Sequence, residues 1–559
     1  MKLHLFTGSA QIVRDERFTD ARQSSNRSSQ GLEETKSIRE PSESAAPSTA
    51  KSAVIIAGLF LVMFLIALDR LIIGVAIPSI TDQFHSLEDI GWYGSAYLLT
   101  SSAFMLFMGR IYTFYNPKWV YLGSLVVFEI GSAVCGAAPN SNALIIGRAI
   151  AGLGNAGLFQ GAVVVIVYII PLHQRSLIMG LGGAVFGVAS VIGPLLGGAF
   201  TDGPGWRWCF YINLPCGGAV FVLLVLFLHI PKEMLNRKPT TAREKVARLD
   251  PIGTLFFLPG ITCLLLALQW GGVTYPWSES RIIALLCSSA ILIVAFAIVQ
   301  WWKSDNATVP KHIATRRGIM AGAWFALFSE GATTVLTYFL PIWFQAIKGA
   351  SAVHSGIMNL PLVLGIVVTS ILAGIATKRI GYFTQWMILS SAIMPIGAGM
   401  ISTFTPATGH SAWIGYQALY GLGAGLGMQQ TSLAAQTILP RQDVATGVAL
   451  MLFFRTLGGA IFISVGNNVF VSRLAHSLLE LTGPNVGSVA NMGATDLRQM
   501  ISATLLPQVL TAYNDALRAT FNLATAISCL TVFGAVFMEW KSVKQGADAD
   551  EAKNEKTEV

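Results

Sequence analysis

Five ionisable side chains interrupt long apolar stretches of this sequence: Asp69, Glu129, Arg148, Glu330 and Arg455. A charged group in the middle of a bilayer costs about 2.5–3.5 kcal/mol on insertion scales, so each of these groups needs a partner or a water-filled cavity. Removal from water favours the protonated form of a carboxyl group, whereas a nearby arginine favours the ionised form. A carboxylate whose arginine moves away can therefore take up and release a proton, which is the chemistry of proton-coupled transport.

Four of these residues are candidates for proton coupling: Asp69, Arg148, Glu330 and Arg455. Asp69 lies shortly before Pro78. Glu330 lies at a similar distance before Pro341, so the two acids occupy corresponding places in two parts of the chain. The alternative role is a static ion pair that holds helices in register, and we favour this alternative for Glu129. Glu330 could also lie close enough to the surface to be solvated.

The composition predicts that these residues sit in a membrane protein. The chain has 559 residues, of which 53% are hydrophobic and only 12% charged, whereas soluble domains carry about 25% charged residues. About fourteen apolar runs reach the roughly 20 residues that cross a ~30 Å hydrocarbon core. We expect spans near 52–74, 91–112, 119–138, 144–168, 176–200, 208–230, 251–270, 282–302, 319–346, 354–376, 384–404, 412–433, 444–468 and 518–540. The predicted fold class is an all-α membrane protein.

The distribution of basic residues predicts how the spans are oriented. Lysine and arginine gather in the linkers 231–250 and 303–317, whereas the loop 81–90 has none. Positively charged loops remain cytoplasmic, so both chain ends are expected inside and the number of spans even. The net charge of +8 then reflects this bias, and we expect no nucleic-acid partner. Residues 1–51, expected to be disordered, and 541–559 are predicted cytoplasmic tails.

A weak internal repeat predicts two related halves. Gly-Leu-Gly triplets at 152–154 and 421–423 are each followed by a proline at the same spacing. Parallel repeats with a substrate site between them are a common plan for transporters. The expected domains are two pseudo-symmetric six-helix bundles at 52–230 and 319–540, the latter with a long outer segment 469–516, separated by 231–318, which holds cytoplasmic linkers and two extra spans at 251–302. These extra spans are expected to pack peripherally against both halves.

The predicted fifth span combines small residues with one proline: Gly187, Gly193, Pro194, Gly197 and Gly198. Glycines allow another helix to approach to backbone contact, and membrane helices tolerate proline. We expect this smooth, kinkable helix to pack closely where two bundles rock against each other. The alternative is a generic packing face of small residues.

Three motifs lie in the predicted first, fourth and fifth spans. They are Leu68-Asp69-Arg70-Leu-Ile-Ile-Gly-Val-Ala-Ile-Pro78, Gly147-Arg148-Ala-Ile-Ala-Gly152-Leu-Gly154, and the Gly-Pro run of the fifth span. Together they resemble the fourteen-helix drug:proton antiporter branch of the major facilitator superfamily, in its fungal form, over roughly 50–545. The resemblance implies that Arg148 takes part in proton transfer. After the second span, however, Thr113 stands where the family usually carries an acidic residue of a charge relay.

The resemblance implies a function as well as a fold. It points to a monomeric plasma-membrane exporter that moves a toxin, secondary metabolite or drug by proton antiport, without a cofactor. Tyr97, Phe159 and Tyr338 are candidates for the wall of the substrate cavity, although many membrane aromatics are interfacial anchors. Alternatives are an uptake or vacuolar transporter, for example of a siderophore or basic amino acid, and a transport-dead sensor. No metal-ligand spacing or Ser/His/Asp arrangement in the sequence indicates an enzyme.

Overall fold

The computed structural model describes residues 49–85, 89–230, 249–272, 275–304, 307–440, 442–482 and 506–544, and these residues form helices joined by short connections, with no strand beyond two isolated bridges. The predicted tail up to residue 48, most of the basic linker 231–250, part of the outer segment 469–516 and the end of the chain from 545 lie outside the described residues.

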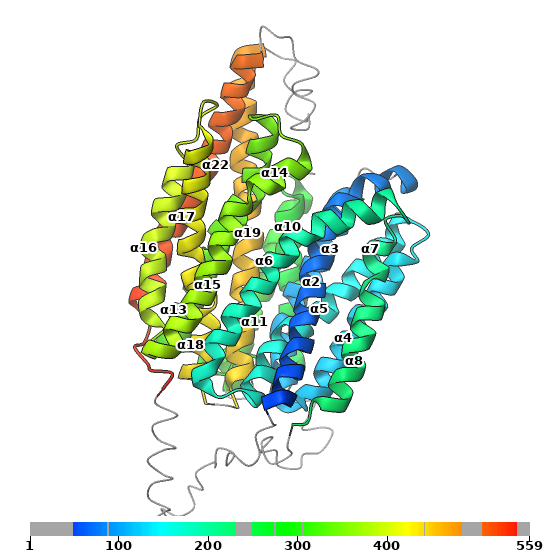
Figure 1. The fold of residues 1–559 in the computed structure, drawn as a ribbon, viewed down its shortest axis with the longest axis vertical. Coiled ribbons are helices and arrows are strands. Elements are labelled where there is room, and N and C mark those ends of the chain that lie inside the picture. The colour runs from blue at the N-terminus through cyan, green and yellow to red at the C-terminus, as the bar shows by residue number, and fades with distance from the viewer. Residues whose placement is uncertain are drawn as a thin grey trace, which may run out of the picture. The chain divides into compact units, whose positions relative to one another are not determined.

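The helices follow one another along the chain as Figure 1 shows. The first set is α2 (Thr49–Phe84), α3 (Ile90–Phe114), α4 (Pro117–Gly136), α5 (Ser141–Ile169), α6 (Leu172–Asp202), α7 (Trp208–Tyr211) and α8 (Asn213–Phe227). A pair, α10 (Pro251–Trp270) and α11 (Ser280–Lys303), comes next. The last set is α12 (Lys311–Ala314), α13 (Arg317–Ala346), α14 (Ala352–Met358), α15 (Leu360–Ile380), α16 (Thr384–Ile401), α17 (His410–Met428), α18 (Gln430–Ile438), α19 (Val444–Thr482) and α22 (Leu506–Val536).

The helices confirm the predicted all-α membrane fold. Among the described residues, 12 helices are long and apolar enough to cross a membrane. The two other predicted spans, at 91–112 and 412–433, coincide with the more polar helix α3 and with α17, which continues into α18. Each predicted span is therefore helical.

Several predicted boundaries are shifted in the structure. Helix α2 already begins at Thr49, so the last residues of the predicted N-terminal tail are helical. Helices α19 and α22 extend into both ends of the predicted outer segment 469–516. Residues 541–544, in the predicted C-terminal tail, pack against the end of α15, where the amide of Val543 donates to the carbonyl oxygen of Gly381 at 2.8 Å. Apolar periodicity does not register such polar extensions of a helix.

Local sequence explains where several helices begin. Pro117 opens α4 at a position where no amide hydrogen is needed, and Asn116 accepts a hydrogen bond from the amide of Lys118 at 3.0 Å. Asn140 caps α5 in the same way through the amide of Ala143. Asp250 caps α10 and also accepts a hydrogen bond from Nζ of Lys303 at 2.8 Å. This last contact ties the N-cap residue of α10 to the end of α11.

Helix packing separates an early set from a late set. In Figure 1 the blue-to-green helices α2 to α8 lie on the right and the green-to-red helices α13 to α22 on the left. Helix α6 packs against α15, and α3 packs against α19, so these two pairs connect the sets. Helix α10 packs on α11 and also contacts both α3 and α19. The cavity described below therefore lies between elements from distant parts of the chain.

Close packing of α6 against α15 depends on glycine positions. A Cβ atom added at Gly187 would lie 2.0 Å from Cγ2 of Val367 on α15. At Gly193 it would lie 3.2 Å from Cβ of Leu71 on α2, which is a tight contact. Gly197 is buried, whereas a Cβ at Gly198 would meet nothing within 4 Å. The close-packing expectation thus fits Gly187 and Gly193 but not Gly198, because that glycine faces open space.

This difference generates a matched pair of variants. Gly187→Leu places a large side chain where Val367 already lies, and overpacking of this kind costs about 1–3 kcal/mol. We expect transport to fall about tenfold with near-normal expression, while Gly198→Leu keeps transport close to wild type. Dye transport in vesicles, normalised to the amount of folded protein, measures both. Equal loss in the two variants would contradict a role for the α6–α15 contact.

The predicted orientation can be tested with one residue before α11 and one residue after it, on opposite sides of the membrane. Ser278 is exposed in the connection from α10 to α11, and Thr315 is exposed between α12 and α13. In a variant without native cysteines, Ser278→Cys should react with an impermeant thiol reagent in intact cells. Thr315→Cys should react only after permeabilisation, because the flanking linkers are basic. Labelling of Thr315→Cys from outside would reverse the orientation, and the cysteine-free parent controls for background.

Candidate functional site

Asp69 and Arg148 form a buried ion pair between α2 and α5. Nη1 of Arg148 donates to Oδ2 of Asp69 at 2.6 Å, and the two side chains are 1% and 0% exposed, respectively. Nε of Arg148 also donates to the carbonyl oxygen of Tyr93 on α3 at 2.8 Å. The pairing and the added hydrogen bond offset the cost of removing both charges from water. The structure thus brings together the acid and the arginine that the sequence placed in separate spans.

A buried amide connects this pair to the neighbouring helices. Nδ2 of Asn213, at the start of α8, donates to Oδ1 of Asp69 at 3.3 Å and to Oγ of Ser132 on α4 at 3.1 Å. Asn213 and Ser132 are fully buried. Sequence reasoning did not assign either residue to the site. The available signal was an amide in the first turn of an apolar span, where a polar group needs a partner.

Glu129 lies one turn before Ser132 on α4 and behaves differently from Asp69. Both carboxylate oxygens are buried without a hydrogen-bond partner in the described part of the chain. They face α8, because a Cβ added at Gly217 would lie 1.7 Å from Oε1 of Glu129. The static ion pair expected for Glu129 therefore does not form among the described residues.

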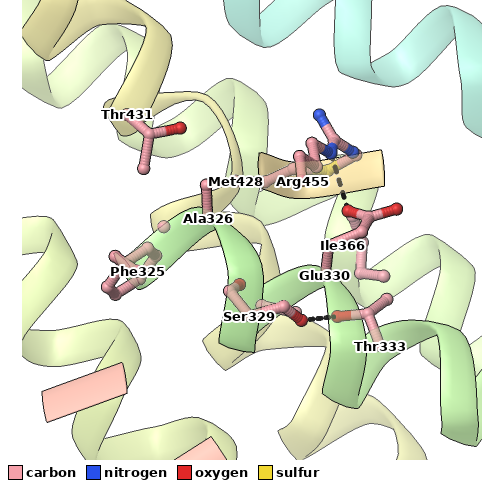
Figure 2. Close-up of a pocket in the computed structure, with 11 residues that line it drawn as sticks. Phe325, Ala326, Ser329, Glu330, Thr333, Ile366, Met428, Thr431 and Arg455 are labelled. Carbon is pink, nitrogen blue, oxygen red and sulfur yellow. Dashed lines mark hydrogen bonds and ion pairs between the residues drawn. The ribbon is translucent and has the colours of Figure 1, made fainter. Parts of the chain in front are cut away.

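Glu330 and Arg455 form a second ion pair, between α13 and α19. Nε of Arg455 donates to Oε2 of Glu330 at 2.6 Å. Figure 2 shows the two side chains pointing toward one another at the edge of a small pocket, next to Ser329 and Thr333. The side chain of Arg455 is 17% exposed and that of Glu330 is 24% exposed. Glu330 is therefore paired, not simply solvated, and this pair is more accessible than that of Asp69.

A cavity of about 660 Å³ lies between the early and late helices. Its volume falls within the roughly 300–1,000 Å³ of sites for drug-sized ligands. Tyr97, Phe159 and Tyr338, the three aromatic candidates, all line it. The ring of Tyr97 also lies 4.5 Å from the guanidinium carbon of Arg148. One aromatic ring thus contacts the buried ion pair on one side and lines the cavity on the other.

Helices α3 and α5 contact α19 near their predicted cytoplasmic ends. The hydroxyl groups of Thr113 and Thr446 lie 3.1 Å apart, and Nε2 of Gln160 donates to the carbonyl oxygen of Ala445 at 3.0 Å. A Cβ added at Gly109 would lie 2.6 Å from Cβ of Ala449. Neutral hydroxyl and amide groups thus make the contact at the position where the related family carries an acid. In the predicted orientation, this is a state closed on the inner side.

The described residues contain no group of three or more His, Cys, Asp or Glu side chains that could hold a metal ion. The site combines two ion pairs with an aromatic-lined cavity. The Asp69–Arg148 pair is buried, whereas the Glu330–Arg455 pair is accessible from the cavity. Such an arrangement can bind an organic molecule and exchange a proton at a carboxylate.

Comparison with known proteins identifies the family of this chain. The chain matches the family model of the Major Facilitator Superfamily over residues 59–463. It is 53% identical over 495 residues to the MFS-type efflux pump MFS1 of Arthroderma benhamiae, which covers 88% of this chain and 92% of the relative. It is 47% identical over 502 residues to the rubrofusarin-specific efflux pump aurT of Gibberella zeae, with 90% and 92% covered.

A solved structure supports the fold alone. The proton:xylose symporter XylE, itself of this superfamily, matches with a TM-score of 0.57 at 15% identity, covering 89% of this chain and 99% of the symporter. The family match spans most of the chain, and the fungal relatives align over nearly their whole length. The chain therefore belongs to the Major Facilitator Superfamily and is of the fungal efflux-pump type.

Proposed function

We propose that this multi-pass membrane protein is a secondary active transporter of the plasma membrane that exports a small organic compound in exchange for protons. The observation that carries the proton step is the sealed Asp69–Arg148 pair, separated from the cavity by the ring of Tyr97. The export direction follows from similarity to relatives that are named efflux pumps.

The ion pair offers a physical reason for proton exchange. While α2 and α5 hold the side chains together, the carboxylate of Asp69 is paired with Arg148. A rearrangement that separates them leaves a carboxylate without its cation in a poorly hydrated site, where its charge is costly. Uptake of a proton removes that charge, and return of Arg148 favours release of the proton. The cycle needs no group besides the two side chains and water.

Helix α3 is the element that links the proton step to the substrate. Its Tyr93 carbonyl oxygen accepts the hydrogen bond from Arg148, and its Tyr97 side chain lines the cavity. Further along the same helix, Thr113 makes the inner contact with Thr446. Movement of α3 during opening of the inner side would therefore disturb the surroundings of Arg148 and of bound substrate together. This coupling favours antiport over two independent events.

The test is Asp69→Asn in inside-out vesicles with an acidic lumen. Wild type should accumulate a fluorescent dye, with fluorescein and rhodamine 123 as probes, only while the pH gradient is present. Asparagine keeps the size of the side chain and an acceptor for Arg148 but cannot cycle a proton. We expect gradient-driven accumulation to fall to the level of vesicles without the protein, while size-exclusion behaviour stays that of wild type.

Asp515→Asn is the matched control and should leave accumulation unchanged. Within the described residues, the one ion pair of Asp515 is a 3.6 Å surface contact with Arg518. Accumulation by Asp69→Asn at the wild-type rate across a range of pH would disprove the proton role. Accumulation that requires the opposite gradient would favour uptake instead of export.

A further inference from the structure

Among the residues that the structure describes, the lining of the cavity carries one positive charge without a counter-charge. Its charged lining residues are Arg70, Glu330 and Arg455. Glu330 and Arg455 neutralise one another through the 2.6 Å contact. Arg70, on α2, is exposed and has no hydrogen-bond or ion-pair partner among the described residues. The neighbouring Asp69 cannot supply the missing charge, because it is fully buried and bound to Arg148.

An unpaired guanidinium in such a wall creates a strong local potential. Low-dielectric surroundings strengthen and focus the field of a charge compared with bulk water. A guanidinium also presents several donors in a plane, which matches a carboxylate or another oxyanion. A ligand cation, in contrast, would find one carboxylate in the described lining, that of Glu330, and Arg455 already neutralises it. The charge of the lining therefore favours an anion and opposes a cation.

The remaining lining favours flat, aromatic molecules. Phe159 packs edge-to-face with Phe186 at a centroid distance of 5.7 Å, and both line the cavity. Trp92, also in the lining, makes an edge-to-face contact of 5.7 Å with Trp270. These pairs present fixed ring faces and edges, on which an aromatic ligand can stack. Polar lining groups such as Asn155 and Asn467 add hydrogen-bonding capacity without charge.

We infer that the exported compounds are planar aromatic acids, whose carboxylate or phenolate pairs with Arg70 while their rings occupy the aromatic part of the cavity. This inference rests on the proposed function, since it names the substrate class of the same cavity. Arg70 acts as a specificity-determining residue, separate from the adjacent Asp69, which takes the proton.

The test compares two dyes that share a xanthene core and differ in charge. Fluorescein is anionic near neutral pH and rhodamine 123 is cationic. Binding to the purified full-length protein in detergent is measured by fluorescence polarisation, which needs no pH gradient. Wild type should bind fluorescein about tenfold or more tightly than rhodamine 123, as expected for a charge-assisted hydrogen bond.

Three variants separate the role of Arg70 from general effects. Arg70→Gln should weaken fluorescein binding about tenfold and strengthen rhodamine 123 binding, a gain that a misfolded protein would not show. Arg70→Lys should retain most of the fluorescein affinity. Arg281→Gln is the control for surface charge, because Arg281 is exposed at the start of α11 and contacts only Tyr275 in the described residues.

Several results would overturn the inference: rhodamine 123 binding as tightly as fluorescein, binding of neither dye, or an unchanged fluorescein affinity in Arg70→Gln. These results are distinguishable from failure of the proposed antiport. If fluorescein binds through Arg70 but its transport ignores the pH gradient, the substrate class stands and the proton step is wrong. If rhodamine 123 is preferred and is driven by the gradient, the antiport stands and the substrate class is wrong.

Discussion

The cost of placing charges in hydrocarbon is the constraint on which this molecule depends. Arg148 is buried where three helices converge on it: α2 supplies the carboxylate of Asp69, α3 supplies a carbonyl oxygen, and α5 carries the arginine itself. Convergence requires α3 and α5 to lie very close together. Gly152 permits this, since a Cβ there would lie 2.2 Å from the carbonyl oxygen of Tyr97. The same stretch of α5, from Arg148 to Gly152, thus provides both the buried charge and the close helix contact that its burial requires.

The two ion pairs differ in accessibility, and this difference gives the pair on the early helices and the pair on the late helices different roles. The Asp69–Arg148 pair is buried behind the ring of Tyr97, whereas Glu330 and Arg455 line the cavity directly. A sealed pair can respond only to helix movement, while an accessible pair can respond to water and ligand. The early and the late helices therefore offer different chemistry to a bound molecule.

The sequence predicted which helices exist and which charges need partners, because apolar run length and the rarity of membrane charges are strong signals. It nominated Asp69 and Arg148 from this argument alone. It could not predict rotation of a helix about its own axis, which decides that Gly187 meets α15 while Gly198 meets nothing. For the same reason, the sequence did not identify the contact of Asn213 with Asp69 or the exposure of Arg70 to the cavity. Spans predicted from the average hydropathy of about 20 residues likewise do not reveal the roles of single polar residues at helix ends.

The hydroxyl contact between Thr113 and Thr446 has a consequence for energetics. An inner contact made by opposite charges would weaken as dissolved ions screen it, and its strength would vary with the salt content of the cytoplasm. A contact between two neutral hydroxyls, supported by the close approach of Gly109 to Ala449, has no such dependence. Its strength is set by shape and short-range hydrogen bonding, so this contact adds no salt-dependent contribution to the balance between closed and open inner states.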